Sequence, residues 1–387
     1  DGTIVDAFVY ASGDADVQGW AGGALEMPPT DLSGLILMRG DGCGSLPDTD
    51  TAADWSVRWL RLGASLFCDD GIFTSTGSLT PMFSPEGGLH QLVSWIGQAQ
   101  ETIHVHVYQF SSPEVHSALA SAVQRGVECT VLLEGGILGE TSSLDDQRGW
   151  ASELSAAGCQ VLWMVEPEGA NAAQSPYRYI HAKVAVADGN SVWIDSGNLK
   201  RSTFPLDADM GNRDWGIIID SEDVADLVLS RMLWDESTDH NHIIAQDDLH
   251  PTLGRPTGWT AGSASTAYSA SLQFPTTETG DFSGRILTCP DDCIEGLIWV
   301  IDQAEDSLDL SLQYFDLGWH WGYGDNPLID AVERAAGERG VKVRLIINGY
   351  YVFEDDDIRE TVNYFNHELN MTQGLDVTAI IMSPSGN

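Results

Sequence analysis

The chain has 387 residues, and its 58 acidic and 18 basic side chains give a formal net charge of −40. A chain of this length can bury a large core in two or three domains, and its 43% hydrophobic content with 13 Trp excludes an intrinsically disordered protein. The acidic residues are spread along the sequence, which is typical of a salt-adapted surface and argues against general affinity for nucleic acid or anionic membranes at low salt. No apolar run approaches the roughly 20 residues that cross a bilayer, so we expect a soluble chain.

Residues 1–70 are rich in Gly, Asp and Pro and contain short apolar runs at Ile4–Tyr10 and Leu35–Met38. This pattern predicts a small β-rich N-terminal segment. The segment resembles the end of a lamin-tail-like β-sandwich.

The six cysteines fall into three pairs of sequence neighbours: Cys43 with Cys68, Cys129 with Cys159, and Cys289 with Cys293. An even number in local pairs suits disulfides and a secreted or cell-surface protein. Cys129 and Cys159 each lie in an apolar run that predicts a strand, where buried free thiols are the alternative. A zinc site is not expected, because no Cys-x-x-Cys or Cys/His cluster has ligand spacing.

From residue 71 to 239 the pattern changes to alternating helices and strands. Helices are expected at 90–98, 114–124, 145–157 and 221–234, and strands at 102–110, 128–133 and 160–164. This order predicts an α/β domain with helices packed on a mostly parallel sheet. Residues 240–284, rich in Thr, Ser, Gly and Pro, are predicted to be a connector.

Residues 285–387 repeat this pattern. Ile96–Phe110 aligns with Ile301–Phe315, and both runs carry Gln-Ala at the helix end and Phe at the strand end. Further matches are Arg125-Gly126-Val127 with Arg339-Gly340-Val341 and Gly158 with Gly374. We therefore predict a duplicated α/β/α sandwich. The equivalent of residue 181 would fall beyond Asn387, so the second copy is expected to be truncated before its own motif.

Lysine occurs at only three positions, and one of them, Lys183, belongs to the motif His181-x-Lys183-x4-Asp188. Residues 179–187 alternate as a strand does, with His181 and Lys183 on one face, and Asp188-Gly189-Asn190 predicts a turn into a second strand. A two-residue turn at Gly189-Asn190 places His181 opposite Asn198 and Lys183 opposite Ser196. The same turn moved back by one residue places His181 opposite Ser196. In either register an imidazole, an ammonium, a hydroxyl and a carboxamide converge, a set that can attack and hold a phosphoryl group.

This motif, followed by Ser196, Asn198 and Asn212-Arg213-Asp214, resembles the phospholipase D superfamily over about residues 71–387. The sequence departs from the family at Asp195, where the family usually has Gly. A carboxylate at this position would crowd an anionic substrate or point away from it.

The resemblance implies that two His-x-Lys motifs face one pocket, with His181 as the nucleophile that forms a phosphohistidine and the partner His as acid and base. Lys183, Ser196 and Asn198 would hold the phosphoryl oxygens. Asp188 would orient a histidine or fix the turn. No metal or other cofactor is implied, because Lys and Asn stabilise the charge.

Three functions follow as hypotheses. The first is a secreted or cell-surface phosphodiesterase that hydrolyses or transfers phosphatidyl groups and touches the membrane surface transiently. A nuclease of the same superfamily and a non-catalytic extracellular binding or structural protein are the alternatives. Asp214 is predicted to pair with Arg213. His104 and His106 lack a third ligand nearby and are predicted to be packed or surface residues rather than metal ligands.

Overall fold

The computed structural model describes residues 8–10, 13, 16–26, 36–39, 49–58, 71–138, 141–165, 179–207, 211–240, 242–268, 276–289, 292–318, 326–349 and 356–382. The chain divides into two compact units, one of Gly71–Ile286 and one of Asp1–Asp70 with Leu287–Asn387. Each unit has a hydrophobic core of its own.

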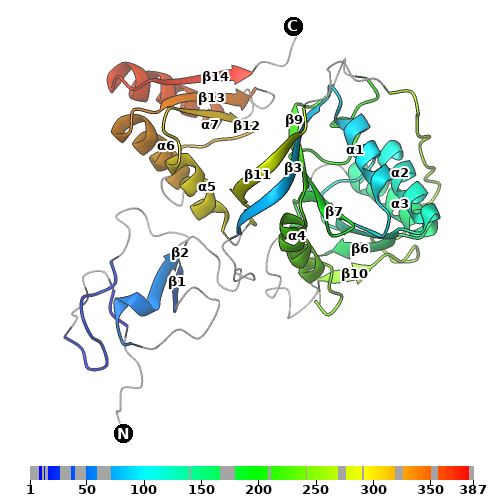
Figure 1. Cartoon of the computed structure of the whole chain (residues 1–387), viewed down its shortest axis with the longest axis horizontal. Coiled ribbons are helices and arrows are strands. Elements are labelled where there is room, and N and C mark those ends of the chain that lie inside the picture. Colours follow the sequence, from blue (N-terminus) through cyan, green and yellow to red (C-terminus); the bar gives the residue numbers. More distant parts are fainter. Residues whose placement is uncertain are drawn as a thin grey trace. The chain divides into compact units, whose positions relative to one another are not determined.

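A nine-stranded sheet in the order β10-β6-β5-β4-β7-β8-β9-β3-β11 forms the centre of the unit Gly71–Ile286 (Figure 1). Its strands are β3 (Ile72–Ser84), β4 (Thr102–Val107), β5 (Glu128–Glu134), β6 (Gln160–Met164), β7 (Lys183–Ala187), β8 (Ser191–Asp195), β9 (Asp214–Asp220), β10 (Ile243–Ala245) and β11 (Glu278–Arg285). Within the described strands, β4–β5 and β5–β6 are parallel and the other six neighbouring pairs are antiparallel. The prediction of a mostly parallel sheet is therefore wrong, because helices connect only β4, β5 and β6 as crossovers require.

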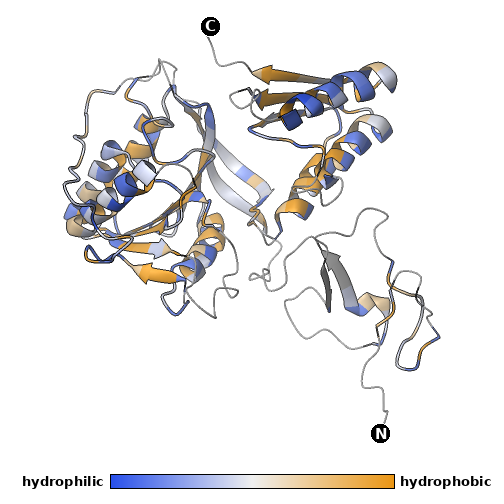
Figure 2. Cartoon of the chain, turned by 180° about the vertical axis from the view of Figure 1, so that it is seen from behind, coloured by the Kyte–Doolittle hydropathy of each residue, from blue (hydrophilic) through white to orange (hydrophobic). Residues whose placement is uncertain are grey.

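Helices cover both faces of this sheet (Figure 1). They are α1 (Gly88–Gln98), α2 (Pro113–Arg125), α3 (Thr141–Ala157) and α4 (Glu222–Asp235). Apolar residues of α1, α2 and α3 share one core with Ala185 and Ala187 of β7, whereas α4 packs in another core with Val186. This alternation follows from the two-residue period of a strand, and the hydropathy colouring shows apolar strands between helices with polar outer faces (Figure 2).

The predicted connector, residues 240–284, contains two strands of this sheet. β10 pairs with β6 at one edge, and β11 pairs with β3 along Ile72–Leu79 at the other. Hydroxyl groups join β3 and β11 across the strands, including Thr74 with Ser283 at 3.0 Å and Thr80 with Thr277 at 2.8 Å. The connector assignment is thus corrected: polar strands that pair with a sheet edge lack the apolar alternation that identifies strands in a sequence.

The second copy of the repeat has the same order of elements as the first. It contains α5 (Cys293–Asp302), β12 (Ser307–Leu312), α6 (Pro327–Glu338), β13 (Lys342–Asn348), α7 (Asp356–Asn363), which continues as the π-helix η3 (Tyr364–Thr372), and β14 (Val377–Met382). Its strands form a parallel sheet in the order β12-β13-β14, as β4, β5 and β6 do. β12 begins and ends at the residues that the sequence alignment pairs with the ends of β4, so the duplication is confirmed.

The two copies also begin and end a helix alike. Ser112 and Asn326 cap the N-termini of α2 and α6, and each is followed by Pro, a residue that suits the first helical turn. Gly126 and Gly340 follow the same helices with φ of 100° and 72°, a left-handed conformation that favours glycine. The repeated Arg-Gly-Val signal therefore marks a helix end.

The N-terminal segment contains β1 (Ile36–Arg39) and β2 (Trp55–Arg58), which pair antiparallel, with a short 3-10 helix η1 (Ala52–Asp54) before β2. Tyr10 forms an isolated bridge with Leu25. The described part of residues 1–70 is thus β-containing, as expected. Of the run Leu35–Met38, residues 36–38 lie in β1, whereas Ile4–Ala7 and Leu35 lie outside the described residues. The lamin-tail-like resemblance stays a prediction.

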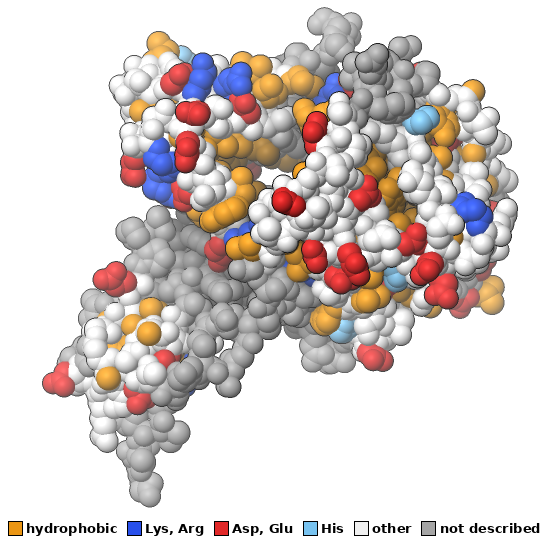
Figure 3. All heavy atoms as spheres, viewed as in Figure 1, with side chains coloured by type: hydrophobic (Ala, Val, Ile, Leu, Met, Phe, Trp, Pro, Cys, Tyr) orange, Lys and Arg blue, Asp and Glu red, His pale blue; other side chains and the backbone are white. Residues whose placement is uncertain are grey.

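Acidic side chains are dispersed over the visible face of the molecule rather than gathered in one patch (Figure 3). This distribution agrees with the spread of Asp and Glu along the sequence. In the part of the chain that the structure describes, no helix combines the length and apolar character that a membrane span requires.

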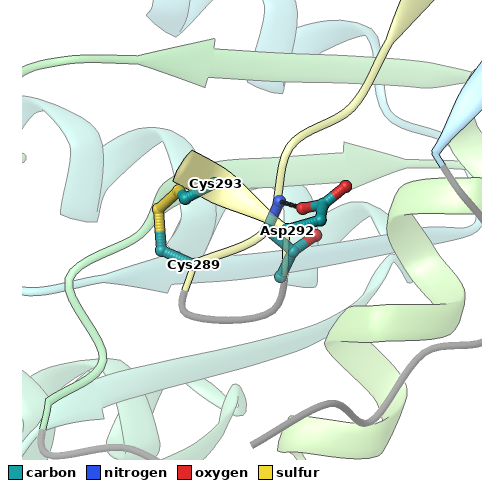
Figure 4. Close-up of a disulfide and its surroundings, with 4 residues drawn as sticks. Cys289, Asp292 and Cys293 are labelled. Atoms are coloured by element: carbon teal, nitrogen blue, oxygen red, sulfur yellow. Dashed lines mark hydrogen bonds between the residues drawn. A yellow bond between two sulfur atoms is a disulfide. The ribbon is translucent and has the colours of Figure 1, made fainter. Parts of the chain in front are cut away.

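Two of the three expected cysteine pairs form disulfides. Cys129 and Cys159 join β5 to the residue before β6, and Cys289 and Cys293 close a short loop at the start of α5 (Figure 4). In the same loop the backbone N–H of Thr288 donates to the Asp292 carboxylate at 2.7 Å. Cys43 and Cys68 lie outside the described residues.

We expect the Cys129–Cys159 disulfide to stabilise the fold more than the Cys289–Cys293 disulfide, because their cysteines are 30 and 4 residues apart. Chain entropy predicts that the double variant C129A/C159A loses about 3–4 kcal/mol of unfolding free energy and that C289A/C293A loses about 2 kcal/mol. Urea unfolding of both variants measures these losses, and equal losses would contradict the expected order.

Candidate active site

The motif lies at the centre of the large sheet. β7 runs between β4 and β8, and Lys183, its first residue, pairs with Val107 at the end of β4. By strand alternation Lys183 shares the face of Ala185 and Ala187, which is the face that α1, α2 and α3 cover. The site therefore lies at the carboxyl end of β4.

His181 and Lys183 contact each other directly. The Lys183 Nζ atom lies 3.0 Å from His181 Nδ1 and 3.3 Å from Nε2, and it donates to the His181 carbonyl oxygen at 2.7 Å. The ring of Tyr108 lies 4.6 Å from the His181 ring and 5.7 Å from Lys183 Nζ, measured to ring centroids. An imidazole, an ammonium and an aromatic wall thus form one cluster.

Burial alters the protonation of both groups. Desolvation and the neighbouring Lys183 charge lower the pKa of His181 below its ordinary value of 6.5, although the residue as a whole is exposed. Desolvation lowers the pKa of Lys183 to about 8, against the opposing effect of nearby Asp214 and Asp195. At neutral pH the imidazole is therefore neutral and the amine is charged, which suits a nucleophile beside an anion-binding group.

Glu134, at the end of β5, holds the segment that leads into the motif. Its carboxylate accepts the N–H of Ile180 at 2.8 Å and the N–H of Gly136 at 2.6 Å. Glu134 is 3% exposed, and burial raises the pKa of its carboxyl to about 7. Sequence reasoning missed this residue, although a Glu that ends the apolar run Val131–Leu133 was a signal.

Two carboxyl groups share the face of Lys183. Asp195 ends β8 and Asp214 begins β9, where Asp195 pairs with Gly216. Burial, with the negative charge of Asp214, raises the pKa of Asp195 to about 7. The prediction that Asp214 pairs with Arg213 is wrong, because Arg213 donates to Glu86 and Asp214 accepts the Ser196 hydroxyl at 2.9 Å.

Ser196 and Asn198 lie in the segment after β8, next to the motif. The Ser196 hydroxyl donates to Asp214 and accepts the N–H of Trp215 at 3.0 Å. The Asn198 side chain accepts the N–H of Gln109 at 3.2 Å. Both side chains therefore connect neighbouring elements, whereas the hydrogen bonds of Lys183 Nζ are made with His181.

The hairpin uses a register that lies between the two expected ones. Ala187 pairs with Ser191, and Val184 pairs with Ile194, so the turn contains the three residues 188–190. Continued by one residue, this register sets Lys183 opposite Asp195 instead of Ser196. Both predicted registers are thus wrong by one residue, because the sequence signal for a turn did not fix its length.

Asp188 lies at the opposite end of β7 from His181. Its carboxylate accepts the N–H groups of Gln100, Glu101 and Thr102 at 2.7–3.1 Å, and its φ of 52° belongs to the turn. The structure does not bring Asp188 to the imidazole, so of the two expected roles the geometry favours the one in the turn.

His104 and His106 lie on the opposite face of β4 and bind Glu236, which follows α4. His104 Nδ1 is 2.9 Å and His106 Nε2 is 3.0 Å from its carboxylate oxygens. Among the described residues no group of His, Cys, Asp or Glu is arranged to hold a metal ion. These histidines are packed, as expected.

A cavity of about 520 Å³ lies beyond the end of β4, with both polar and apolar groups in its lining. Gln109 lines it and links it to the site, since its N–H donates to Asn198 and its side chain accepts Lys200 Nζ at 2.9 Å. The remaining lining includes Ser142, Asp145, Asp146 and Trp259. The cavity offers both charge signs, hydroxyl groups and one indole to a small ligand.

Part of the chain matches a known family of domains. The family model described as "Cardiolipin synthase, PLD-like domain" matches residues 92–235, from α1 to the end of α4. No curated protein sequence matches the chain.

Three similar solved structures come from bacteria, and two of them align with less than half of this chain. The phospholipase D family member Nuc from Salmonella typhimurium is 20% identical over 45% of this chain and 98% of its own, with a TM-score of 0.35. NucT from Helicobacter pylori is 18% identical over 42% of this chain and 94% of its own, with a TM-score of 0.30. Polyphosphate kinase from Porphyromonas gingivalis is 16% identical over 70% of this chain and 38% of its own, with a TM-score of 0.41.

Replacing Glu134 by Ala should destabilise the fold, because the buried N–H of Ile180 and the N–H of Gly136 lose their acceptor. We expect a loss of about 2–4 kcal/mol in unfolding free energy, measured by urea unfolding at pH 7. The control E128A changes an exposed residue of the same strand and should cost less than about 0.5 kcal/mol. Equal losses in the two variants would show that Glu134 does not hold the motif.

Proposed function

We propose that this chain is a phosphodiesterase of the phospholipase D superfamily with His181 as its nucleophile, and the match of residues 92–235 to a PLD-like domain supports the proposal. The pairing of His181 with Lys183, 3.0 Å apart, carries this proposal. A neutral imidazole can attack phosphorus, and an adjacent ammonium can hold the non-bridging oxygens where charge develops.

The proposed reaction has two steps. A ring nitrogen of neutral His181 attacks phosphorus, the P–O bond to the leaving alcohol breaks, and that alcohol oxygen takes a proton from a general acid. Water or another alcohol then attacks the phosphohistidine, the N–P bond breaks, and the proton of the attacking hydroxyl returns to the same group. His181 ends the cycle neutral, so the enzyme is regenerated.

The general acid is proposed to be the imidazole of a second His-x-Lys motif. The sequence contains one such motif, at 181–183, so a second chain or a longer form of the protein would supply the other. Lys183, with Asn198 and Ser196 nearby, is proposed to orient the phosphoryl group. Asp188 is proposed to act through the turn.

The proposed substrate class is phospholipid, with hydrolysis or transfer of the phosphatidyl group. The description of the matching family model supports it, and the net charge of −40 disfavours a polyanionic nucleic acid. The cavity lined by Gln109 and Trp259 has room for a head group. Disulfides support a secreted or cell-surface location, since they persist in oxidising compartments.

The test is a product assay at high salt with phosphatidylcholine vesicles, ethanol and, separately, single-stranded DNA. The protein is expected to form phosphatidylethanol and to leave the DNA intact. His181→Ala should lower turnover by about 10³-fold or more, whereas the control His367→Ala, at an exposed histidine, should retain it. Turnover by the His181 variant would contradict the assignment, and cleavage of DNA alone would support the nuclease alternative.

The pH dependence of His181 gives a second test. Because desolvation and Lys183 lower its pKa, the imidazole should lose its proton below pH 6.5, and kcat/KM should fall only as the pH drops through that lower value. NMR titration of the ring measures the pKa directly. Lys183→Met removes a neighbouring positive charge and should raise it. A His181 that titrates at or above 6.5 in the unchanged protein would contradict the electrostatic account.

A further inference from the structure

The departure from the family pattern, Asp195, is buried within the site. It stands at the end of β8, at the position where the family resemblance predicts Gly, and it is 8% exposed. Lys183, Asp195 and Asp214 lie on the adjacent strands β7, β8 and β9, and strand alternation sets all three on one face. The carboxyl group therefore belongs to the surroundings of Lys183 and does not point to solvent.

Glycines on the neighbouring backbone make room for both carboxyl groups. A Cβ atom on Gly216 would lie 2.2 Å from Asp195 Oδ2, and one on Gly197 would lie 2.7 Å from Asp214 Oδ2. The N–H of Gly197 also donates to Asp195 Oδ1 at 2.8 Å. The positions of the two acids are thus built into the backbone of the site.

The charges around Lys183 are unbalanced. Asp195 faces Lys183 from β8 and Asp214 faces it from β9. The other polar groups nearby are the neutral His181, before β7, and the Ser196 hydroxyl, which donates to Asp214. Asp214 Oδ2 is buried and has no hydrogen-bond partner in the described part of the chain. One ammonium is therefore set against two carboxyl groups, which weakens its attraction for an anion.

We propose that Asp195 is a specificity-determining residue that, with Asp214, limits the pocket of Lys183 to anions of a single negative charge. A phosphodiester carries one negative charge, whereas a phosphomonoester approaches two at neutral pH. Coulomb energy scales with the product of the charges, so a second carboxylate penalises the dianion about twice as much in free energy as the monoanion. Such repulsion against the wrong ligand is a common source of specificity.

The protonation of Asp195 adds a pH dependence to this selection. Burial and the charge of Asp214 raise its pKa to about 7. Below that pH the carboxyl is neutral and the dianion is tolerated, and above it the carboxylate repels the dianion. Selectivity is therefore expected to rise with pH between about 6 and 7.5, a range in which Lys183, with its pKa of about 8, is still mostly charged.

The inference rests on the proposed phosphate site, but binding tests it without turnover. Sulfate and dimethyl phosphate serve as probes, since their charges of two and one do not change over this pH range. NMR titration of the His181 ring at pH 7.5 measures the affinity for each. Asp195→Asn should raise affinity roughly tenfold for sulfate and roughly threefold for dimethyl phosphate, in proportion to probe charge, and at pH 5.5 it should match the unchanged protein.

Asp220→Asn is the control, because it removes the same charge at the far end of β9, and it should leave both affinities unchanged. Asp195→Gly restores the usual family residue and replaces the Asn variant if that protein does not fold. Equal gains for both probes, or a difference that persists at pH 5.5, would overturn the inference. Binding of neither probe by any variant would overturn the phosphate site as well, whereas the expected gain without turnover would support the inference and count against the proposed enzyme.

Discussion

Lys183 carries a positive charge on a side chain that is only 7% exposed, and the surrounding structure depends on how this charge is accommodated. A buried ammonium is costly unless polar groups compensate for the lost water. Here the His181 carbonyl and ring are within hydrogen-bond distance, and two carboxyl groups add negative potential. The same dry surroundings strengthen its attraction for an anionic ligand. Burial therefore destabilises the ammonium and also makes it a better anion-binding group.

The register of one hairpin decides which groups share the site with Lys183. Neighbouring residues of a strand point to opposite faces, so a slip of one residue between β7 and β8 would replace a carboxyl by a hydroxyl opposite the ammonium. The turn that fixes this register contains Asp188, whose carboxylate is held by three backbone N–H groups of residues 100–102. Asp188 therefore contributes to the site from a distance, through strand pairing.

Much of the fold could be predicted because its signals are local. Helices α1, α2 and α4 match their expected ranges within two residues, and the repeat predicted β12 from β4. Strand β3 (Ile72–Ser84) was missed, because its Thr, Ser and Gly residues pair with strands on both sides and show no apolar alternation. Strand formation there depends on neighbours far along the chain.

The same distinction separates the parts of the site. His181 and Lys183 are adjacent in sequence and on one strand, so spacing alone predicted their contact. Glu134 ends β5 and Tyr108 follows β4, 46 residues before Ile180 and 73 residues before His181, and only the sheet brings them together. Asp188 is close to His181 in sequence but not in space, because the extended strand β7 lies between them. The expectation that it orients the histidine failed for this reason.

The pairing of β3 with β11 has a practical meaning for the design of fragments. A polypeptide ended at Asp239, after α4, would look complete by its helices, yet the length Ile72–Leu79 of β3 would lose its partner. Unpaired strand edges recruit other chains and promote aggregation. A fragment that begins at Gly71 should therefore extend to Ile286, the residue that closes the pairing through its hydrogen bond to Gly71.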